Sequence, residues 1–237
     1  MEGSGDFGLS GLSAKFQQEW RPRTGLALVS AWASRDEAEA ARAVLDDTVL
    51  LAESSLPDWA LDSLWFATTG GVYNLDRAGT NARDWLRRLA RVCAHHIYCG
   101  QLEDWDPEGE GRIPDGMTGI PGPVSWRWTG VVLDELLLAA PRLTRATQTA
   151  ETQLLVSGVA PALELVVREV SPDLGFRLLL RCLSVYRVPL AIDRFHRFTV
   201  IGERFGYGSG LVQLMADLID SDDRGSSTTG HVLHPSV

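Results

Sequence analysis

The segment from Asn81 to Gly100 constrains the fold most strongly, because its apolar residues recur with the period of an α-helix. Asn81 can accept a hydrogen bond from the first turn, and Asp84 lies near the positive end of the helix dipole. Gly100 stands where a C-terminal cap belongs. The apolar face of this helix is expected to carry Trp85, Leu89, Val92, His96 and Cys99. The segment therefore predicts an amphipathic helix over 81–100.

Helical patterns continue along most of the chain. A Ser34-x-x-Glu37 capping box precedes an amphipathic stretch, which predicts a helix over 35–53. The apolar run from Gly25 to Ala33 is too short to be assigned to a strand or a helix. The remaining helices are expected from Pro57 to Thr69-Gly70-Gly71, after Trp128 as far as Leu138 with Pro141 closing it, and over 143–170, 173–188, 190–204 and 209–220.

Three local features refine this outline. Pro161 is expected to split or kink the helix over 143–170, because proline lacks the backbone N–H that a helix interior needs. Ser171-Pro172 supplies a cap and a first-turn proline for the next helix. The segment from Leu174 to Leu183 is apolar nearly all round apart from Arg177 and Arg181, so it is expected in the centre of a bundle.

We therefore predict an all-α, mainly helical fold, a single compact multi-helix domain with about seven or eight helices. The domain is expected to span 25–220 and to contain a long acidic loop at 101–123. Residues 1–24 are predicted to form a flexible N-terminal arm. Residues 221–237 are polar, rich in Gly, Ser and Thr, and aperiodic, which predicts a disordered tail.

Composition separates the broad functional classes. Hydrophobic residues make up 45% of the chain, which is enough for a sizeable core. A net charge of -9 argues against nucleic acid as the main partner of the whole surface. Lys15 is the single lysine among 22 basic residues. The arginine excess fits a coding bias, selection against lysine modification, or a need for planar cations that hold carboxylate or phosphate.

Cysteine usage and apolar runs bear on the compartment. Three cysteines are an odd number and form no disulfide framework. The N-terminus lacks the features of a secretory signal. The most apolar run, Val131 to Ala140, is interrupted by Asp134 and Glu135 and is too short to cross a bilayer. We expect a cytoplasmic or nuclear protein without a membrane span.

An arginine stripe is the first candidate binding site. Arg83, Arg87, Arg91 and His95 recur every four residues and share one face of the helix over 81–100. Like charges at this spacing repel, so a partner is expected to offset the cost. That partner is either solvent and the chain's own acidic residues at 103–110, or an external acidic protein, phosphate or nucleic acid.

Tryptophans and a second arginine group extend the candidate surface. Trp105, Trp126 and Trp128 lie in or beside the long acidic loop, where they either fill the core or anchor an interface. Arg194 and Arg197 interleave with Phe195 and Phe198 in a composition that also suits base stacking. On a helix, however, the two phenylalanines would be ordinary core residues.

Motifs for catalysis and metal binding are weak. Cys93, His95, His96 and Cys99 offer soft ligands, but a zinc site needs four ligands of suitable spacing, and the favoured interpretation is that they are buried core residues. The acidic loop lacks the spacing of an EF-hand. The glycines at 206–210 lack the lysine of a phosphate-binding loop, and no nucleophile elbow is present. No metal and no cofactor are predicted.

These patterns favour a non-enzymatic helical interaction or adaptor protein. It would bind a protein partner or associate with itself through the Trp-bearing acidic loop and the arginine stripe. The alternative is a protein that binds nucleic acid or a phosphate ligand through its arginine-rich helices. A third and weaker hypothesis is a metal-dependent enzyme built on His95, His96 and the acidic loop.

Overall fold

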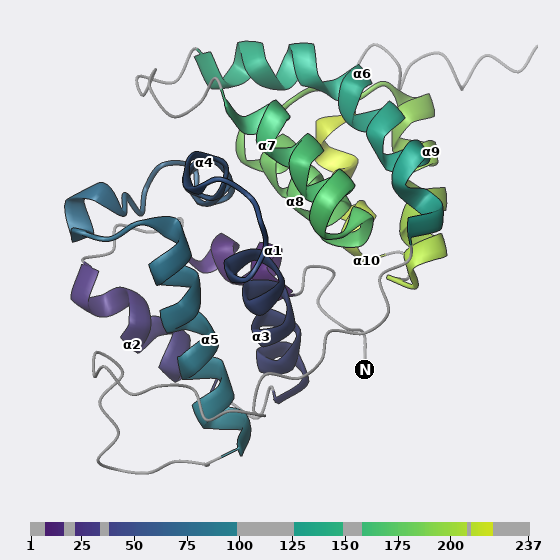
Figure 1. Ribbon diagram of the computed structural model, residues 1–237. Helices are drawn as coiled ribbons and strands as arrows, with labels where there is room; N and C mark the ends of the chain where they lie inside the picture. Colours follow the sequence, from purple (N-terminus) through teal and green to yellow (C-terminus); the bar gives the residue numbers. More distant parts are fainter. Residues whose placement is uncertain are drawn as a thin grey trace, which may run out of the picture.

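A computed structural model describes residues 8–16, 22–33, 38–98, 126–148, 158–207 and 210–219. The predicted all-α class is confirmed, because the described residues form helices and no strand, apart from one isolated bridge between Leu190 and Ile219. The helices gather in one compact arrangement, with α1–α5 on one side and α6–α10 on the other (Figure 1). The predicted acidic loop 101–123 and the tail 221–237 lie outside the described residues.

In the part of the chain that the structure describes, the first group contains five α-helices and one short 3-10 helix. Its elements are α1 (Gly8–Lys15), α2 (Pro22–Ala33), α3 (Ala38–Ala52), α4 (Asp58–Thr68), η1 (Asp76–Ala78) and α5 (Ala82–Tyr98). The three helices predicted at 35–53, after Pro57 and over 81–100 are therefore present. The Asn81 cap is also confirmed, since its Oδ1 accepts a hydrogen bond from the backbone N–H of Asp84 at 2.8 Å.

Part of the N-terminal segment 1–24, which was expected to be a loose arm, is helical. Residues 8–15 form α1, and its side chains Leu9 and Leu12 are buried together with Phe16. The expectation rested on the Gly/Ser-rich composition and did not take account of these three large apolar residues, which are three and four positions apart, as on one face of a helix. The run 25–33, which periodicity left open, lies within α2.

An aromatic cluster forms the core of the first group. Phe16, Trp65, Tyr73 and Trp85 meet edge to face or tilted, with ring centroids 5.0 to 6.1 Å apart. They come from four separate parts of the chain, and such contacts add stabilisation beyond the burial of apolar area. Gly25 lets α2 approach this cluster closely, because a Cβ there would lie 2.6 Å from the Tyr73 hydroxyl.

The second group begins with a helix longer than predicted. Its elements are η2 (Trp126–Trp128), α6 (Thr129–Gln148), α7 (Val159–Leu165), the π-helix η4 (Val166–Val170), α8 (Pro172–Val185), α9 (Ile192–Phe205), α10 (Gly210–Gln213) and η5 (Ala216–Leu218). Pro141 does not end α6 but lies inside it, with its side chain exposed. A proline on the solvent side kinks a helix without ending it, and α6 changes direction along its course (Figure 1).

Two further boundaries differ from prediction. Residues 143–148 belong to α6, and the next described helix, α7, starts at Val159. Pro161 therefore stands in the first turn of α7, where backbone N–H groups have no intrahelical acceptor and proline is tolerated. The single helix predicted over 209–220 is instead the short α10 followed by η5.

The predicted start of α8 is confirmed. The Ser171 hydroxyl accepts a hydrogen bond from the backbone N–H of Leu174, and Pro172 occupies the first turn. As expected for a central helix, α8 is buried over most of its length. It packs on α4, α6 and α7, and α4 also packs on α7, so α8 and α4 join the two groups.

Candidate functional site

Arg83 lies against the end of α3. Its Nε donates to Asp58 Oδ1 at 2.8 Å, and its Nη1 donates to the carbonyl oxygens of Ala52 and Ser54 at 2.6 and 3.1 Å. Its Nη2 donates to the carbonyl oxygen of Leu56. The last carbonyls of a helix lack intrahelical partners, and a guanidinium with five N–H groups can satisfy several of them. Arg83 therefore holds the α3–α4 connection in place.

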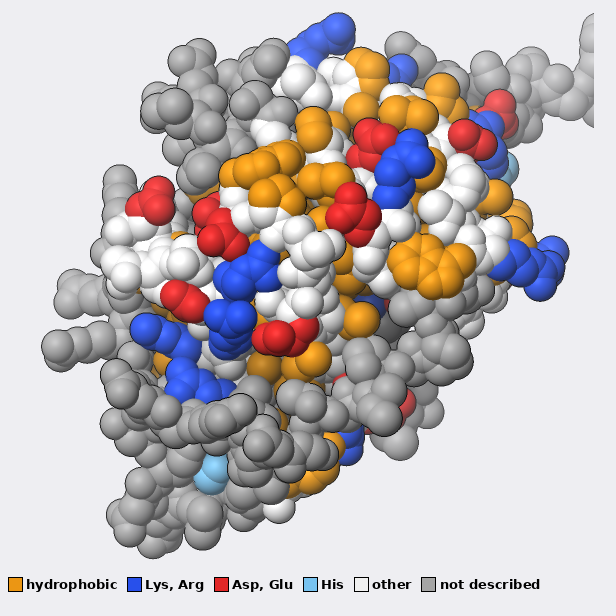
Figure 2. Space-filling model, in the orientation of Figure 1, with side chains coloured by type: hydrophobic (Ala, Val, Ile, Leu, Met, Phe, Trp, Pro, Cys, Tyr) orange, Lys and Arg blue, Asp and Glu red, His pale blue; other side chains and the backbone are white. Residues whose placement is uncertain are grey.

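Arg87 continues the stripe at the surface. Its guanidinium is half exposed and lies 3.5 Å from the carboxylates of Glu53 and Asp84. Arginine and acidic side chains stand next to one another over this part of the molecule (Figure 2). The acidic residues at 103–110, which were one expected partner of the arginine stripe, lie outside the described residues. Glu53, Asp58 and Asp84, close to the ends of α3, α4 and α5, provide the observed counter-charges.

The end of the stripe lies near a serine–histidine contact. Arg91 and His95 are half-buried, and the neighbouring His96 shares a 2.8 Å hydrogen bond between its Nε2 and the Ser30 hydroxyl. Burial lowers the pKa of His95. Burial and then the charge of His95 lower the pKa of His96. Both rings are therefore biased toward the neutral form, which limits their use as cationic binding groups.

A buried ion pair connects the two groups of helices. Of its members, only Arg177 was singled out from the sequence. Arg177 Nη1 and Nη2 donate to Asp47 Oδ2 and Oδ1 at 2.6 and 2.7 Å, and Nη2 also reaches Asp173 Oδ2 at 3.2 Å. The backbone N–H of Leu9 donates to Asp47 Oδ2 at 2.8 Å. Burial lowers the pKa of Arg177, but Asp47 and Asp173 outweigh it and raise the pKa well above its ordinary value.

The signal for this cluster was an arginine pair inside an apolar helix. Arg177 and Arg181 are both buried on α8, and Arg181 Nε donates to the carbonyl oxygen of Thr68 on α4 at 3.0 Å. A buried charge must be paired or hydrogen-bonded. The partner of Arg177, Asp47, however, lies on the amphipathic helix α3, where the sequence alone predicts that an aspartate is exposed to solvent.

Arg194 and Arg197 face a buried carboxylate on α6. Arg197 Nε lies 2.6 Å from Glu135 Oε1, and Arg194 Nε lies 3.7 Å from Glu135 Oε2. Burial lowers the pKa of Arg194, an effect that Glu135 opposes. The interleaved Phe198 is buried against Phe176, with ring centroids 5.7 Å apart. The two arginines therefore dock α9 on α6, and the arrangement of aromatic residues is that of a core.

The tryptophans beside the long loop divide between surface and partial burial. Trp105 lies outside the described residues. Trp126 is 48% exposed at the start of η2, and Trp128 is half-buried beneath the guanidinium carbons of Arg127 and Arg204, at 5.0 and 5.9 Å from its ring centroid. Since residues 126–128 form a 3-10 turn, strand-like alternation does not apply here.

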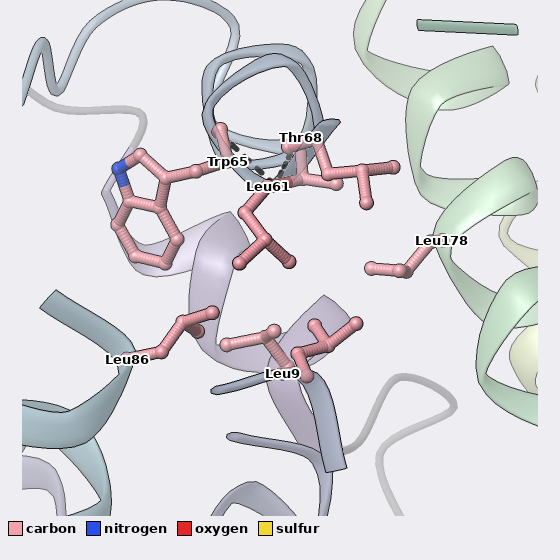
Figure 3. Close-up of a pocket in the computed structure, with 8 residues that line it drawn as sticks. Leu9, Leu61, Trp65, Thr68, Leu86 and Leu178 are labelled. Carbon is pink, nitrogen blue, oxygen red and sulfur yellow. Dashed lines mark hydrogen bonds between the residues drawn. The ribbon is translucent and has the colours of Figure 1, made fainter. Parts of the chain in front are cut away.

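The cavity where the two groups meet is too small to bind a ligand. Side chains from α1, α4, α5 and α8 converge on it, with Leu9, Leu61, Leu86 and Leu178 among them (Figure 3). Its volume of about 10 Å³ corresponds to roughly one water molecule, and its walls are mostly leucine side chains. It is a packing defect of the core, and the hydroxyl of Thr68, which also lines it, donates to the carbonyl oxygens of Leu64 and Trp65 within α4.

The described residues offer neither a metal site nor a membrane-spanning helix. No group of three or more His, Cys, Asp or Glu side chains is placed to hold a metal ion within the described part of the chain. None of the helices described by the structure is both long enough and apolar enough to cross a membrane. Cys93 and Cys182 are buried thiols, and burial raises the pKa of each to about 12.

Among the helices that the structure describes, α6 carries the most large exposed apolar side chains, and they lie on its outer face. Val131 is 40% exposed, and Leu137 and Leu138 are each 54% exposed. Pro141 is exposed on the following turn, and Trp126 lies just before the helix. The opposite face is buried through Val132, Leu136, Ala139 and Leu143. We call Val131, Asp134, Leu137, Leu138, Pro141, Arg142 and Arg145 the outer face of α6.

No family model matches the sequence, and no curated protein and no solved structure is similar to it. The candidate site therefore rests on the geometry of the described residues. That geometry commits Arg83, Arg194 and Arg197 to contacts within the fold and leaves apolar side chains exposed on α6.

Proposed function

We propose that the chain is a non-enzymatic helical interaction protein, which binds a protein partner or a second copy through the outer face of α6 and the adjoining Trp126. The observation that carries this proposal is the exposure of Leu137 and Leu138, at 54% each, on a helix whose other face is buried. Scattered apolar residues are normal on a protein surface, whereas several on one helix face are typical of an interface.

The proposal changes the surface that the sequence favoured. The arginine stripe was expected to be part of it, but Arg83 and Arg87 are engaged by groups near the end of α3. Trp126 remains part of it, and aromatic residues are common anchors at interfaces. The outer face of α6 replaces the stripe.

Variants on two helices test the proposal. Leu137→Glu combined with Leu138→Glu should abolish self-association in size-exclusion chromatography with light scattering, or abolish capture of a partner in a pull-down. Val200→Glu is the matched control, because Val200 is 52% exposed on α9 and lies outside the proposed surface. A strictly monomeric protein that captures no partner would contradict the proposal, as would equal loss of binding in both variants.

The alternative function, nucleic-acid or phosphate binding, has less support. Arg177 and Arg181 are buried, and Arg194 and Arg197 form ion pairs with Glu135. The observation in its favour is Trp128 beneath Arg127 and Arg204, since basic groups beside an aromatic ring suit base stacking. Binding to a labelled oligonucleotide that weakens steeply with added salt would support it, and no binding at low salt would exclude it.

A further inference from the structure

The outer face of α6 has the spacing of a helix–helix seam. Val131, Asp134, Leu138, Pro141 and Arg145 are alternately three and four residues apart, and all five are exposed. Apolar residues with this alternation form the contact line between two helices in a coiled coil. This row of five residues on α6 is short, and only three of them are apolar. Charge as well as apolar contact must therefore decide what binds to it.

The charges of this face are self-complementary in only one orientation. Asp134 lies four residues before Leu138, and Arg142 lies four residues after it. If a second α6 runs antiparallel with Leu138 on the two-fold axis, each Asp134 stands opposite the Arg142 of the other copy. A parallel, in-register pair would instead bring Asp134 against Asp134 and Arg142 against Arg142, which repel.

Resting on the proposed function, we propose that the partner of the outer face of α6 is a second copy of this chain, bound as an antiparallel two-fold dimer centred on Leu138. A two-fold interface uses the same patch on both subunits, so one helix face must complement itself. Leu138 packs against its counterpart on the axis, and Val131 approaches the aliphatic part of Arg145 from the other copy. Two Asp134–Arg142 pairs flank the centre.

Two local features are compatible with this arrangement. Arg142 Nη1 donates to the Pro189 carbonyl oxygen at 3.0 Å, which uses one of five guanidinium N–H groups and leaves the exposed side chain able to meet a carboxylate. Pro141, where a proline is expected to bend α6, lies within one turn of Leu138. The paired charges are only one turn from the axis, so a curved helix still brings them together.

Charge reversal tests the register directly. Asp134→Arg and Arg142→Asp should each weaken the dimer by at least about tenfold in sedimentation velocity, because each places like charges opposite one another. The double variant Asp134→Arg/Arg142→Asp restores opposite charges and should return the dissociation constant close to that of the wild type. Glu203→Arg, an exposed charge reversal on α9, is the control and should leave the dimer unchanged.

A cysteine at the axis gives an independent readout. In a background with Cys99→Ser, Leu138→Cys should form a disulfide-linked dimer under mild oxidation, whereas Val200→Cys should not. A wild-type protein that stays monomeric, or a dimer unaffected by both charge reversals, would overturn this inference. If such a monomer still captured another protein through Leu137 and Leu138, the proposed function would stand while the dimer fell. Circular dichroism confirms that each variant is folded.

Discussion

Asp47 on α3 and Arg177 on α8 are 130 positions apart in the sequence and form a doubly hydrogen-bonded ion pair inside the protein. Their side chains are 6% and 4% exposed. The same aspartate accepts the backbone N–H of Leu9, so one carboxylate joins α1, α3 and α8. The contact between the two groups of helices therefore includes a polar junction beside its apolar packing.

Removing one partner of this junction should be costly. Asp47→Ala leaves the buried Arg177 guanidinium without its bidentate carboxylate partner, and we expect the free energy of unfolding to fall by about 3–5 kcal/mol. Chemical denaturation monitored by circular dichroism measures it. Asp47→Ala/Arg177→Met removes both charges and should recover a large part of the loss. A single variant within about 1 kcal/mol of wild type would show that the pair is not a stabilising junction.

Two arginines that look equivalent in the sequence should differ in stability effect. Arg83→Ala removes hydrogen bonds to three backbone carbonyls and to Asp58, and should destabilise the protein by about 2–3 kcal/mol. Arg87→Ala removes only exposed ion pairs and should change stability by less than about 1 kcal/mol. Urea unfolding of both variants makes the comparison, and equal effects would refute the structural role of Arg83.

Gly8 tests whether α1 belongs to the core. Its φ is 61°, and a Cβ there would collide with the Asp47 carboxylate and the Arg177 guanidinium. Gly8→Ala should therefore cost at least about 1–2 kcal/mol. Gly130→Ala is the control, because Gly130 lies within α6 with open space around it, and the change should stabilise the helix by about 0.5–1 kcal/mol. Thermal unfolding that shifts equally in both variants would contradict this role.

The histidine pair should make stability depend on pH. Burial lowers the pKa of His95 and of His96 below the ordinary value of 6.5, so the unfolded chain binds more protons near that pH. Stability is therefore expected to fall as pH drops through about 6.5 toward the folded-state values. Denaturation measured between pH 8 and pH 5 should show a smaller loss of unfolding free energy for the His95→Gln/His96→Gln variant than for the wild type. Partial burial raises the pKa of Asp173, which makes its contribution to stability change with pH in the opposite direction, so the difference between the two proteins is the quantity to measure.

Local patterns were reliable for helices with clear caps. Asn81 and Ser171 begin α5 and α8 as predicted, since a side chain that satisfies a backbone N–H acts within one turn. Helix boundaries were less reliable near prolines, where Pro141 was expected to close a helix and Pro161 to split or kink one. Pro141 lies within α6 and Pro161 in the first turn of α7, and only the surroundings of each proline decide whether a helix continues.

The candidate binding residues were harder to place. The four-residue spacing put Arg83, Arg87 and Arg91 on one helix, but no spacing could show that the carbonyls at the end of α3 meet the first of them. In the same way, the spacing of Arg194 and Arg197 predicted a basic surface and could not reveal their partner in the fold. Glu135, their partner, interrupts an apolar run on another helix, and its burial beside α9 is a tertiary property.

The sequence by itself determined the all-α class, the main helices and the central place of α8, because periodicity and capping act over a few residues. Only the tertiary structure decided which charges are internal, that α1 belongs to the core, and which apolar face remains exposed on α6. Those outcomes depend on residues such as Asp47 and Arg177 that meet across the chain, and burial converts their charges from solvated groups into contacts that join the two groups of helices.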